Sequence, residues 1–209
     1  MQDKESITMK RVCLLLILLV VSAYATTNIW ARTGQAYGIE PRLLYAISKV
    51  ESNVRPLVVS VNFTKLTKMQ RDKLYALLQN RQIPFHTYTK VIEINNQNIA
   101  QASEIIDFLD ANKYPSFDIG LMQINNIHKE TLKAHKVSLH TLLDEDTNLN
   151  VAAGILWECY KKHRSNNKAI NAYNGKLRGN TYYAKVSVEL QKLLLPHERT
   201  SKRLFYRVL

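Results

Sequence analysis

The chain has 209 residues, of which 46% are hydrophobic, so its length and composition fit one compact domain with a hydrophobic core. Lysine and arginine number 29 against 17 aspartates and glutamates, and the resulting net charge of +12 predicts an anionic partner. Of the two cysteines, Cys13 lies in the leader described next, so Cys159 alone remains and an internal disulfide is excluded.

The N-terminal segment is predicted to be a secretory signal peptide. Lys10 and Arg11 precede the apolar run VCLLLILLVVSAYA, which ends in the A-x-A pattern of residues 23–25. The run is shorter than the roughly 20 apolar residues that a spanning helix needs, so we favour cleavage after Ala25 over a membrane anchor. We therefore expect residues 1–25 to be removed and the protein to lie in the periplasm, with membrane contact only through an uncleaved leader. Such a protein is expected to meet a cell-wall polymer or a membrane surface rather than nucleic acid.

The residues after the leader predict a series of short helices. Residues 30–37 predict a first helix that ends at Gly38, and Pro41 fits the first turn of a second helix that continues to Glu51. Residues 56–60 are expected to form a turn, because a proline opens them.

A distinct block follows at residues 61–116. Thr67 is a candidate cap for a helix, and the segment PFHTYTKVIEI predicts one strand because it is rich in β-branched and aromatic residues. The turn NNQN then leads into a second helix, and Pro115 closes the block. Apolar residues in helical phase support the two helices: Leu74, Leu77 and Leu78 in the first, and Ile99, Ala102, Ile106 and Leu109 in the second.

The remainder of the chain predicts further helices. The segments LHTLLDEDTNLNVAAGILWECYKKH and NKAINAYNG have mostly helical patterns, and TYYAKVSVELQKLLL is clearly helical. We therefore expect a mainly α (α+β) domain over residues 26–195. Residues 196–209 form a basic tail, which we expect to be solvated rather than docked.

Glu51 occupies a position where the helical pattern calls for an apolar residue. Leu43, Leu44, Ile47 and Val50 form an apolar stripe, and Glu51 is the next position on it. Desolvation and the negative end of the helix dipole both disfavour ionisation, so we expect a pKa above the ordinary value of about 4.3. A glutamic acid that keeps its proton near neutral pH can protonate the leaving oxygen of a glycosidic bond. The alternative is an ordinary glutamate turned toward water.

Three separated motifs elsewhere in the chain add to the evidence from Glu51. ESNVRPLVVS at residues 51–60, GLMQIN at residues 120–125 and AYNG at residues 172–175 resemble, in order and rough spacing, the motifs of the soluble lytic transglycosylases, which share the lysozyme-like fold. NLNVAAGILW and YYAKV are weaker matches to the same family. The resemblance covers residues 30–191 apart from residues 61–116. The DIGLMQIN form is most similar to the specialised members that accompany conjugation, pilus and secretion machines.

The resemblance implies an exported enzyme that cleaves the β-1,4 bond between MurNAc and GlcNAc in peptidoglycan without hydrolysis. Glu51 would first protonate the bridging oxygen and then act as a base toward the C6 hydroxyl of the same MurNAc, which closes a 1,6-anhydro ring. Because the substrate supplies its own nucleophile, no second carboxylate is needed. The implied partners are the glycan strands and components of an envelope-spanning machine.

The resemblance also implies a set of substrate-binding residues. Gly120 would let the backbone pass close to the sugars, Met122 would press its thioether against a sugar ring, and Gln123 would hydrogen-bond the substrate. Tyr173 would place its hydroxyl near Glu51 and steady the carboxyl. The rest of the expected set touches the glycan or holds the loops around it: Ser60 near the acetamido group, Asn125, Asn174 and Tyr182. For Met122, Tyr173 and Tyr182, core packing is the alternative.

The block at residues 61–116 departs from the family pattern. Lysozyme-like folds have a small β element on one side of the cleft here, so we interpret the block as a helix, a strand and a helix inserted into that element. Such an insertion would lengthen or cover the cleft. Four of its aromatic residues are candidate sugar platforms, although we favour packing roles for them: Phe85, Tyr88, Tyr114 and Phe117.

The sequence leaves open the roles of two further acidic residues and two alternative functions. We expect Asp118 to cap the turn before Gly120 and Glu93 to lie on a solvated strand face. If either faced Glu51 across a water-sized gap, a lysozyme-type muramidase would be the alternative. A non-catalytic wall-binding assembly protein is the alternative from another class, and the intact motifs argue against it. The histidines show no metal-ligand spacing with cysteines or acids, so we expect no metal and no cofactor.

Overall fold

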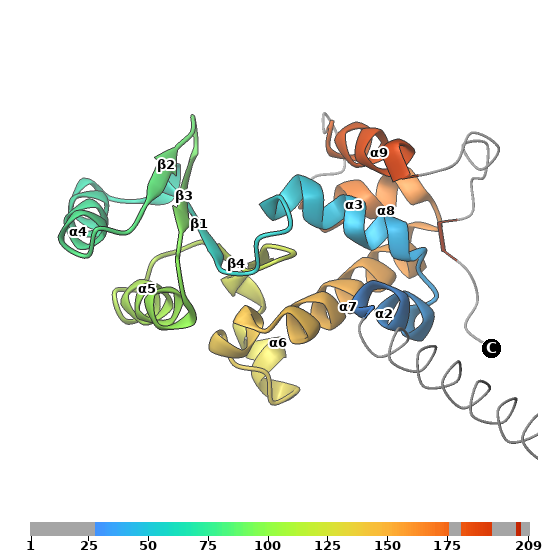
Figure 1. Ribbon diagram of the computed structural model, residues 1–209, viewed down its shortest axis with the longest axis horizontal. Helices are drawn as coiled ribbons and strands as arrows, with labels where there is room; N and C mark the ends of the chain where they lie inside the picture. Colours follow the sequence, from blue (N-terminus) through green and yellow to red (C-terminus); the bar gives the residue numbers. More distant parts are fainter. Residues whose placement is uncertain (1–27, 176–180, 194–203, 206–209) are drawn as a thin grey trace, which may run out of the picture.

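The computed structural model describes residues 28–175, 181–193 and 204–205. The predicted signal peptide at residues 1–25 lies outside these ranges, as does the basic tail apart from Leu204 and Phe205. Figure 1 shows helices gathered on one side of the molecule and a small sheet with two further helices on the other. The expected mainly α class with a β element is therefore confirmed. No helix among the described residues is long and apolar enough to cross a membrane.

The helical side is built from the elements that the apolar periodicity predicted. Their bounds are α2 (Ile29–Tyr37), α3 (Pro41–Ser52), α7 (Glu145–His163), α8 (Asn166–Tyr173) and α9 (Tyr182–Leu193). The local signals also act as expected, because Gly38 ends α2 with a φ of 64° and Pro41 occupies the first turn of α3. Helix α3 packs against α2 and α9, and α7 packs against α2 and α8.

Five short strands form one antiparallel sheet in the order β2-β3-β1-β4-β5. The strands are β1 (Val58–Asn62), β2 (Phe85–Thr87), β3 (Val91–Asn95), β4 (Phe117–Ile119) and β5 (Ile124–Asn125). The expected turn over residues 56–60 is wrong from Val58 onward, because that segment is the central strand. The single strand expected after Pro84 is a hairpin, closed where the amide of Tyr88 donates to the carbonyl oxygen of Val91 at 2.8 Å.

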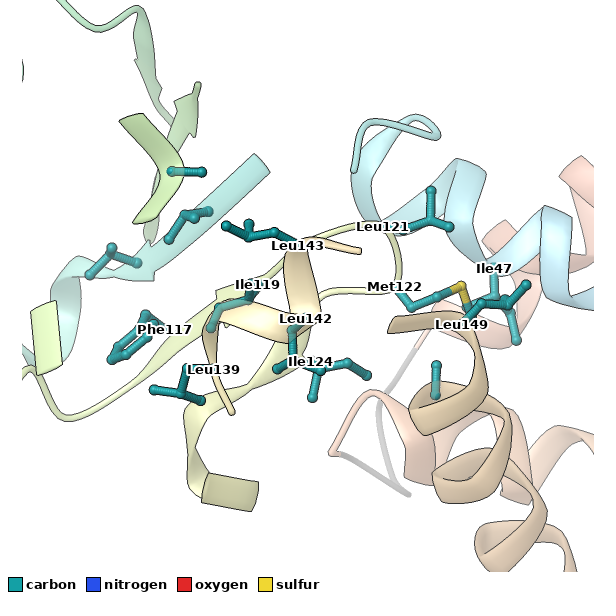
Figure 2. Close-up of a cluster of buried hydrophobic side chains, with 14 of the residues drawn as sticks. Ile47, Phe117, Ile119, Leu121, Met122, Ile124, Leu139, Leu142, Leu143 and Leu149 are labelled. Atoms are coloured by element: carbon teal, nitrogen blue, oxygen red, sulfur yellow. The ribbon is translucent and has the colours of Figure 1, made fainter. Parts of the chain in front are cut away.

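The two faces of the sheet differ sharply in polarity. Side chains on one face are buried and apolar, and Figure 2 shows Phe117, Ile119 and Ile124 from this face packed near Leu139 and Leu142. The alternate positions form the opposite face, as the two-residue period of a strand requires, and all of them except Val58 and Val91 are polar. One polar residue from each strand lies in a row across this face: His86, Glu93, Ser60, Asp118 and Asn125.

The inserted block supplies two helices, α4 (Lys68–Asn80) and α5 (Ile99–Ala111), beside the sheet (Figure 1). The predicted cap is confirmed, because the Thr67 hydroxyl accepts from the Gln70 amide at 3.1 Å and the Gln70 side chain accepts from the Thr67 amide. Ile99 departs from the expected apolar face and is 63% exposed, since it is the first residue of α5. Between the sheet and α7 lie the short helix α6 (Lys129–Ala134) and the 3-10 turn η3 (His140–Leu143).

The described part of the C-terminal tail is docked, and the expectation of a solvated end is wrong there. The amide of Glu40 donates to the carbonyl oxygen of Leu204 at 2.9 Å, and Ile39 forms a β-bridge with Phe205. The Phe205 ring is 5% exposed and stacks on Tyr160, with centroids 4.1 Å apart and ring planes 7° apart. The tail thus contributes an aromatic side chain to the core.

Replacing Phe205 with alanine is expected to lower the stability of the domain. The substitution removes a buried ring and its stacking partner, and a loss of about 2 kcal/mol is expected, because a terminal segment relaxes more easily than the middle of a core. The midpoint of thermal unfolding should fall by about 4–8 °C, and Phe205→Leu should fall less because it keeps apolar contact. An unchanged midpoint for Phe205→Ala would mean that the tail does not dock in solution.

Candidate active site

Glu51 lies one residue before the end of α3, and its carboxyl is turned toward α9. Its Oε1 accepts a hydrogen bond from the hydroxyl of Tyr182, the first residue of α9. The pKa of Glu51 is raised to about 7, chiefly by burial and also by the charge of Asp118, against the opposing effects of the Tyr182 hydrogen bond and Lys185. Glu51 therefore keeps its proton over part of the neutral range, as expected, instead of lying ionised in open water.

A general-acid role for Glu51, which the sequence motifs imply, predicts how activity depends on pH. A general acid must be protonated, so kcat/KM should fall as the pH rises through about 7. Tyr182→Phe removes the hydrogen bond that lowers the pKa of Glu51, so the falling limb should move to higher pH. Rates measured for both proteins from pH 5 to 9 test this. If the falling limb of kcat/KM in Tyr182→Phe stayed at the same pH or moved to lower pH, the Tyr182 hydrogen bond would not lower the pKa of Glu51.

The two tyrosines take different roles from those expected. The hydroxyl of Tyr173 donates to the carbonyl oxygen of Met122 at 2.8 Å, and it is Tyr182 that makes the hydrogen bond to Glu51. Burial and the nearby Glu51 charge hold the pKa of each tyrosine well above its ordinary value, so both hydroxyls remain protonated donors. Tyr182, and not Tyr173 as expected, therefore steadies the Glu51 carboxyl. Tyr173 instead anchors the turn between β4 and β5.

That turn carries the GLMQIN motif, and its backbone explains the glycine. Gly120 has a φ of 78°, in the left-handed region that favours glycine. A Cβ there would lie 2.6 Å from the carbonyl oxygen of Leu142 and would collide with the Asn148 side chain. Gly120 thus makes room for protein groups, and its expected closeness to the sugars stays a prediction.

Met122 also differs from its expected role. Its side chain is fully buried, and Figure 2 shows it beside Ile47 of α3 and Leu149 of α7. No thioether surface is left for a sugar ring, so the packing alternative holds. Met122 joins the turn to the helical side of the core.

Asn148 holds this turn in place and was missed by the sequence analysis. Its Nδ2 donates to the carbonyl oxygens of Ile119 at 2.9 Å and Leu142 at 2.8 Å, and its Oδ1 accepts from the Met122 amide at 2.8 Å. The hydroxyl of Ser52 donates to the carbonyl oxygen of Leu121 at 2.7 Å. One buried amide and one hydroxyl therefore fix the turn to α7 and α3. The signal was an asparagine inside the apolar run NLNVAAGILW.

Gln123 and Ser60 keep polar atoms that can meet a ligand. Gln123 has a φ of 50°, and its Nε2 donates to the carbonyl oxygens of Gly120 at 2.8 Å and Val58 at 3.2 Å. Within the described residues no hydrogen bond is formed by its Oε1 or by the Ser60 hydroxyl, and Ser60 is 8% exposed. Both residues lie at the sheet side of the site, where their free groups can bind a sugar amide or hydroxyl.

Of the other expected binding residues, Asn125 is hydrogen-bonded within the protein and Asn174 lies at the end of α8. The Asn125 Nδ2 donates to Asp118 Oδ1 at 2.7 Å and to the Ser116 hydroxyl at 3.1 Å, while its Oδ1 accepts from the Ile127 amide. Its amide is thus used within the protein. Asn174 caps the end of α8, next to residues 176–180, which lie outside the described ranges.

Asp118 is the second carboxyl of the site. It lies on β4 opposite Ser60, and burial raises its pKa to about 6, against the opposing effects of the Asn125 hydrogen bond and the Lys65 charge. The expected turn-capping role is wrong, because the Gly120 amide donates to the carbonyl oxygen of Val58 at 2.8 Å. Since its charge raises the pKa of Glu51, Asp118 is close enough to influence the chemistry there.

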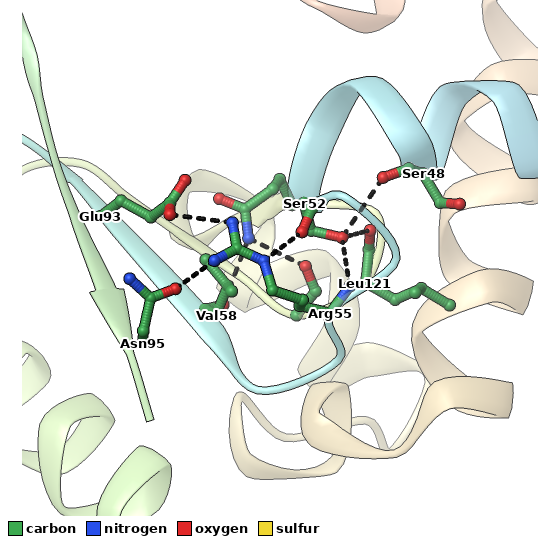
Figure 3. Close-up of polar contacts among 9 residues, drawn as sticks. Ser48, Ser52, Arg55, Val58, Glu93, Asn95 and Leu121 are labelled. Carbon is green, nitrogen blue, oxygen red and sulfur yellow. Dashed lines mark hydrogen bonds and ion pairs between the residues drawn. The ribbon is translucent and has the colours of Figure 1, made fainter. Parts of the chain in front are cut away.

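Arg55 joins the end of α3 to the inserted hairpin (Figure 3). Its Nε donates to the carbonyl oxygen of Ser52 at 2.7 Å, its Nη2 pairs with Glu93 Oε1 at 2.8 Å, and its Nη1 donates to Asn95 Oδ1. The Glu93 side chain is only 16% exposed, so the expected solvated strand face is wrong. Glu93 serves as an anchor for Arg55 instead of as a second acid facing Glu51.

Helices on one side, a small antiparallel sheet on the other and a proton-retaining glutamate where they meet define the lysozyme-like class of glycan-cleaving proteins. The family model described as the transglycosylase SLT domain matches residues 28–187, and the chain belongs to this family. Its members are peptidoglycan lytic transglycosylases, which makes this protein an enzyme that acts on peptidoglycan. A search of curated proteins gave no match. Among the described residues no group of three His, Cys, Asp or Glu side chains is arranged to hold a metal ion.

Proposed function

We propose that Glu51 is the single general acid and base of this lytic transglycosylase, and that the products end in 1,6-anhydroMurNAc. The observation that carries the proposal is the Glu51 carboxyl, whose pKa is raised to about 7 and whose Oε1 is held by Tyr182. A group that titrates near the working pH serves both as a proton donor and, once ionised, as a proton acceptor. This is what a reaction with one acid in both steps requires.

The reaction runs in two proton transfers. The protonated Glu51 gives its proton to the oxygen between MurNAc and GlcNAc as the glycosidic bond breaks, and the leaving sugar departs with a hydroxyl. The Glu51 carboxylate then takes the proton of the C6 hydroxyl, whose oxygen bonds to C1 of the same MurNAc. The Tyr182 hydroxyl holds Oε1 throughout, which leaves Oε2 to face the substrate. The carboxyl ends protonated again, so the cycle is balanced without water.

Hydrolysis is the second candidate, and Asp118 is the observation that favours it. With a pKa of about 6, Asp118 is largely ionised at neutral pH, and its charge acts on Glu51. A carboxylate on the far side of the sugar would activate a water molecule or stabilise positive charge at C1. The products would then carry reducing ends in place of anhydro rings.

Product masses separate the two reactions. Purified peptidoglycan is digested with the wild-type protein, and the released muropeptides are analysed by mass spectrometry. Anhydro products, lighter than reducing ones by one water, are the expected result. Asp118→Asn should still give anhydro ends, whereas reducing ends that disappear in this variant would establish hydrolysis instead.

We also propose that the protein works in the periplasm, after loss of residues 1–25, and opens the wall for a secretion, conjugation or pilus apparatus. The leader pattern supports the first point, and the likeness of DIGLMQIN to the specialised members supports the second. N-terminal sequencing of the periplasmic protein should begin at residue 26. Loss of apparatus assembly in cells that carry Glu51→Gln would support the second point, and normal assembly would exclude it.

A further inference from the structure

We propose that the inserted hairpin β2–β3 adds a glycan-binding stretch to the cleft, so that the enzyme holds sugar units beyond those that Ser60 and Asp118 reach. The inference rests on the proposed function, because it takes the occupant of the cleft to be a glycan strand. It concerns His86, which had no predicted binding role, and Tyr88, a candidate sugar platform for which packing was favoured.

Strand register places a continuous polar line across the sheet. His86 lies opposite Glu93, Glu93 opposite Ser60, Ser60 opposite Asp118, and Asp118 opposite Asn125. Directly opposed residues in antiparallel strands share a face, so all five side chains lie on the face away from the apolar core. Three strand spacings separate Asp118 from His86, a span of about 14 Å. The line therefore runs from the candidate active site to the outer edge of the hairpin.

The outer end of the line has an open aromatic surface. His86 is exposed, the Tyr88 side chain is 52% exposed, and the two ring centroids are 4.4 Å apart. Of the four aromatic residues that were candidates for sugar platforms, Phe117 and Tyr114 are buried and Phe85 is half-buried against Tyr75, so Tyr88 is the most exposed. An aromatic ring with a polar tip suits a sugar, which presents C–H groups on one face and hydroxyls around its rim.

Arg55 gives this surface a fixed place relative to Glu51. Its guanidinium ties Glu93 and Asn95 of β3 to the carbonyl oxygen of Ser52, the residue next to Glu51. The hairpin is thus attached to the end of the catalytic helix by one side chain (Figure 3). A surface held in position before binding loses less entropy when a glycan strand lies along it.

Binding as a function of strand length tests the proposal. The Glu51→Gln protein, which should bind without cleaving, is titrated calorimetrically with peptide-free peptidoglycan strands of defined and increasing length. Affinity should rise until the strand is long enough to reach the hairpin. Adding His86→Ala and Tyr88→Ala should weaken binding of long strands by about threefold to tenfold and leave short strands unaffected. The single variants give the same readout if the double variant does not fold.

Thr87→Ala is the matched control, because Thr87 lies between the two residues on the opposite face of β2. Thr87→Ala should bind glycan strands of every length as tightly as the Glu51→Gln protein does. Tyr88→Phe should retain most of the affinity for long strands because it keeps the ring. Equal losses on short and long strands, or no loss on long ones, would overturn the proposal. Cleavage by the wild type is measured alongside, so that a failure of the hairpin to bind is distinguished from a failure of the proposed activity.

Discussion

Glu51→Gln is expected to reduce the release of soluble muropeptides from purified peptidoglycan by about a hundredfold to ten-thousandfold. Glutamine has nearly the same shape and can still accept the Tyr182 hydrogen bond, so the surroundings of the side chain should change little. It cannot deliver a proton to the glycosidic oxygen or remove one from the C6 hydroxyl. Both steps of the proposed mechanism therefore lose their catalyst at once. Release is followed by chromatography of the soluble fraction over time.

The stability of the same variant provides its control. The pKa of Glu51 is raised from 4.5 to about 7 by folding, so between these values the folded state binds more protons than the unfolded state. The free energy of unfolding of the wild type should consequently fall as the pH rises through this window, by up to about 3 kcal/mol. Glu51→Gln lacks this loss and should unfold at an equal or higher temperature than the wild type above pH 7. A folded variant with wild-type activity would exclude Glu51 from the mechanism.

Asn148→Ala is expected to have the largest effect on stability. The buried side-chain amide bonds the carbonyl oxygens of Ile119 and Leu142 and the backbone amide of Met122, and alanine would remove all three hydrogen bonds. A loss of about 3 kcal/mol is expected, which corresponds to a fall of about 6–12 °C in the midpoint of thermal unfolding. Thermal unfolding followed by circular dichroism measures it.

Asn150→Ala in the same helix is the matched comparison. Asn150 is only partly buried, and its Nδ2 donates to the carbonyl oxygen of Asp146 within α7. Its loss should cost about 1 kcal/mol or less. If the two variants unfolded at the same temperature, the turn that carries Gln123 would not depend on Asn148 for its position.

The elements that the sequence predicted well are those with local signals. Helices α2, α3, α4 and α5 have apolar periodicity together with a cap, a proline or a glycine at an end, and each of these acts within a few residues. The raised pKa of Glu51 follows from the same periodicity, because a carboxyl on an apolar stripe must be desolvated wherever the stripe packs. The effect of Asp118 on that pKa could not be foreseen, since it depends on how β4 lies relative to α3.

The short strands and the hairpin had weak local signals. The turn residues of β2–β3 are Tyr88, Thr89 and Lys90, which contain no glycine or asparagine to mark a reversal. Strand β1 begins two residues after Pro56, and it pairs with β3 and β4 on either side. Strand pairing joins distant parts of the chain, so a single sequence carries little evidence of it.

The roles of individual residues within the candidate active site were the hardest to predict from the sequence. Tyr173 and Tyr182 both lie near Glu51, and which of them reaches the carboxyl depends on how α8 and α9 pack against α3. Met122 and Gly120 belong to a motif associated with substrate, yet their immediate neighbours are protein groups. A motif identifies the turn that borders the cleft, but only the packing decides which side chains of that turn point outward.

Direct titration of the Glu51 carboxyl tests the central claim most directly. In protein labelled with carbon-13 at the glutamate side-chain carboxyl, the signal lost in Glu51→Gln identifies this residue, and its chemical shift is followed from pH 3 to 9. A midpoint near 7 is the predicted result, because the buried carboxyl must keep its proton to act as the acid. A midpoint near 4.5 would show an ordinary ionised glutamate and would contradict the account.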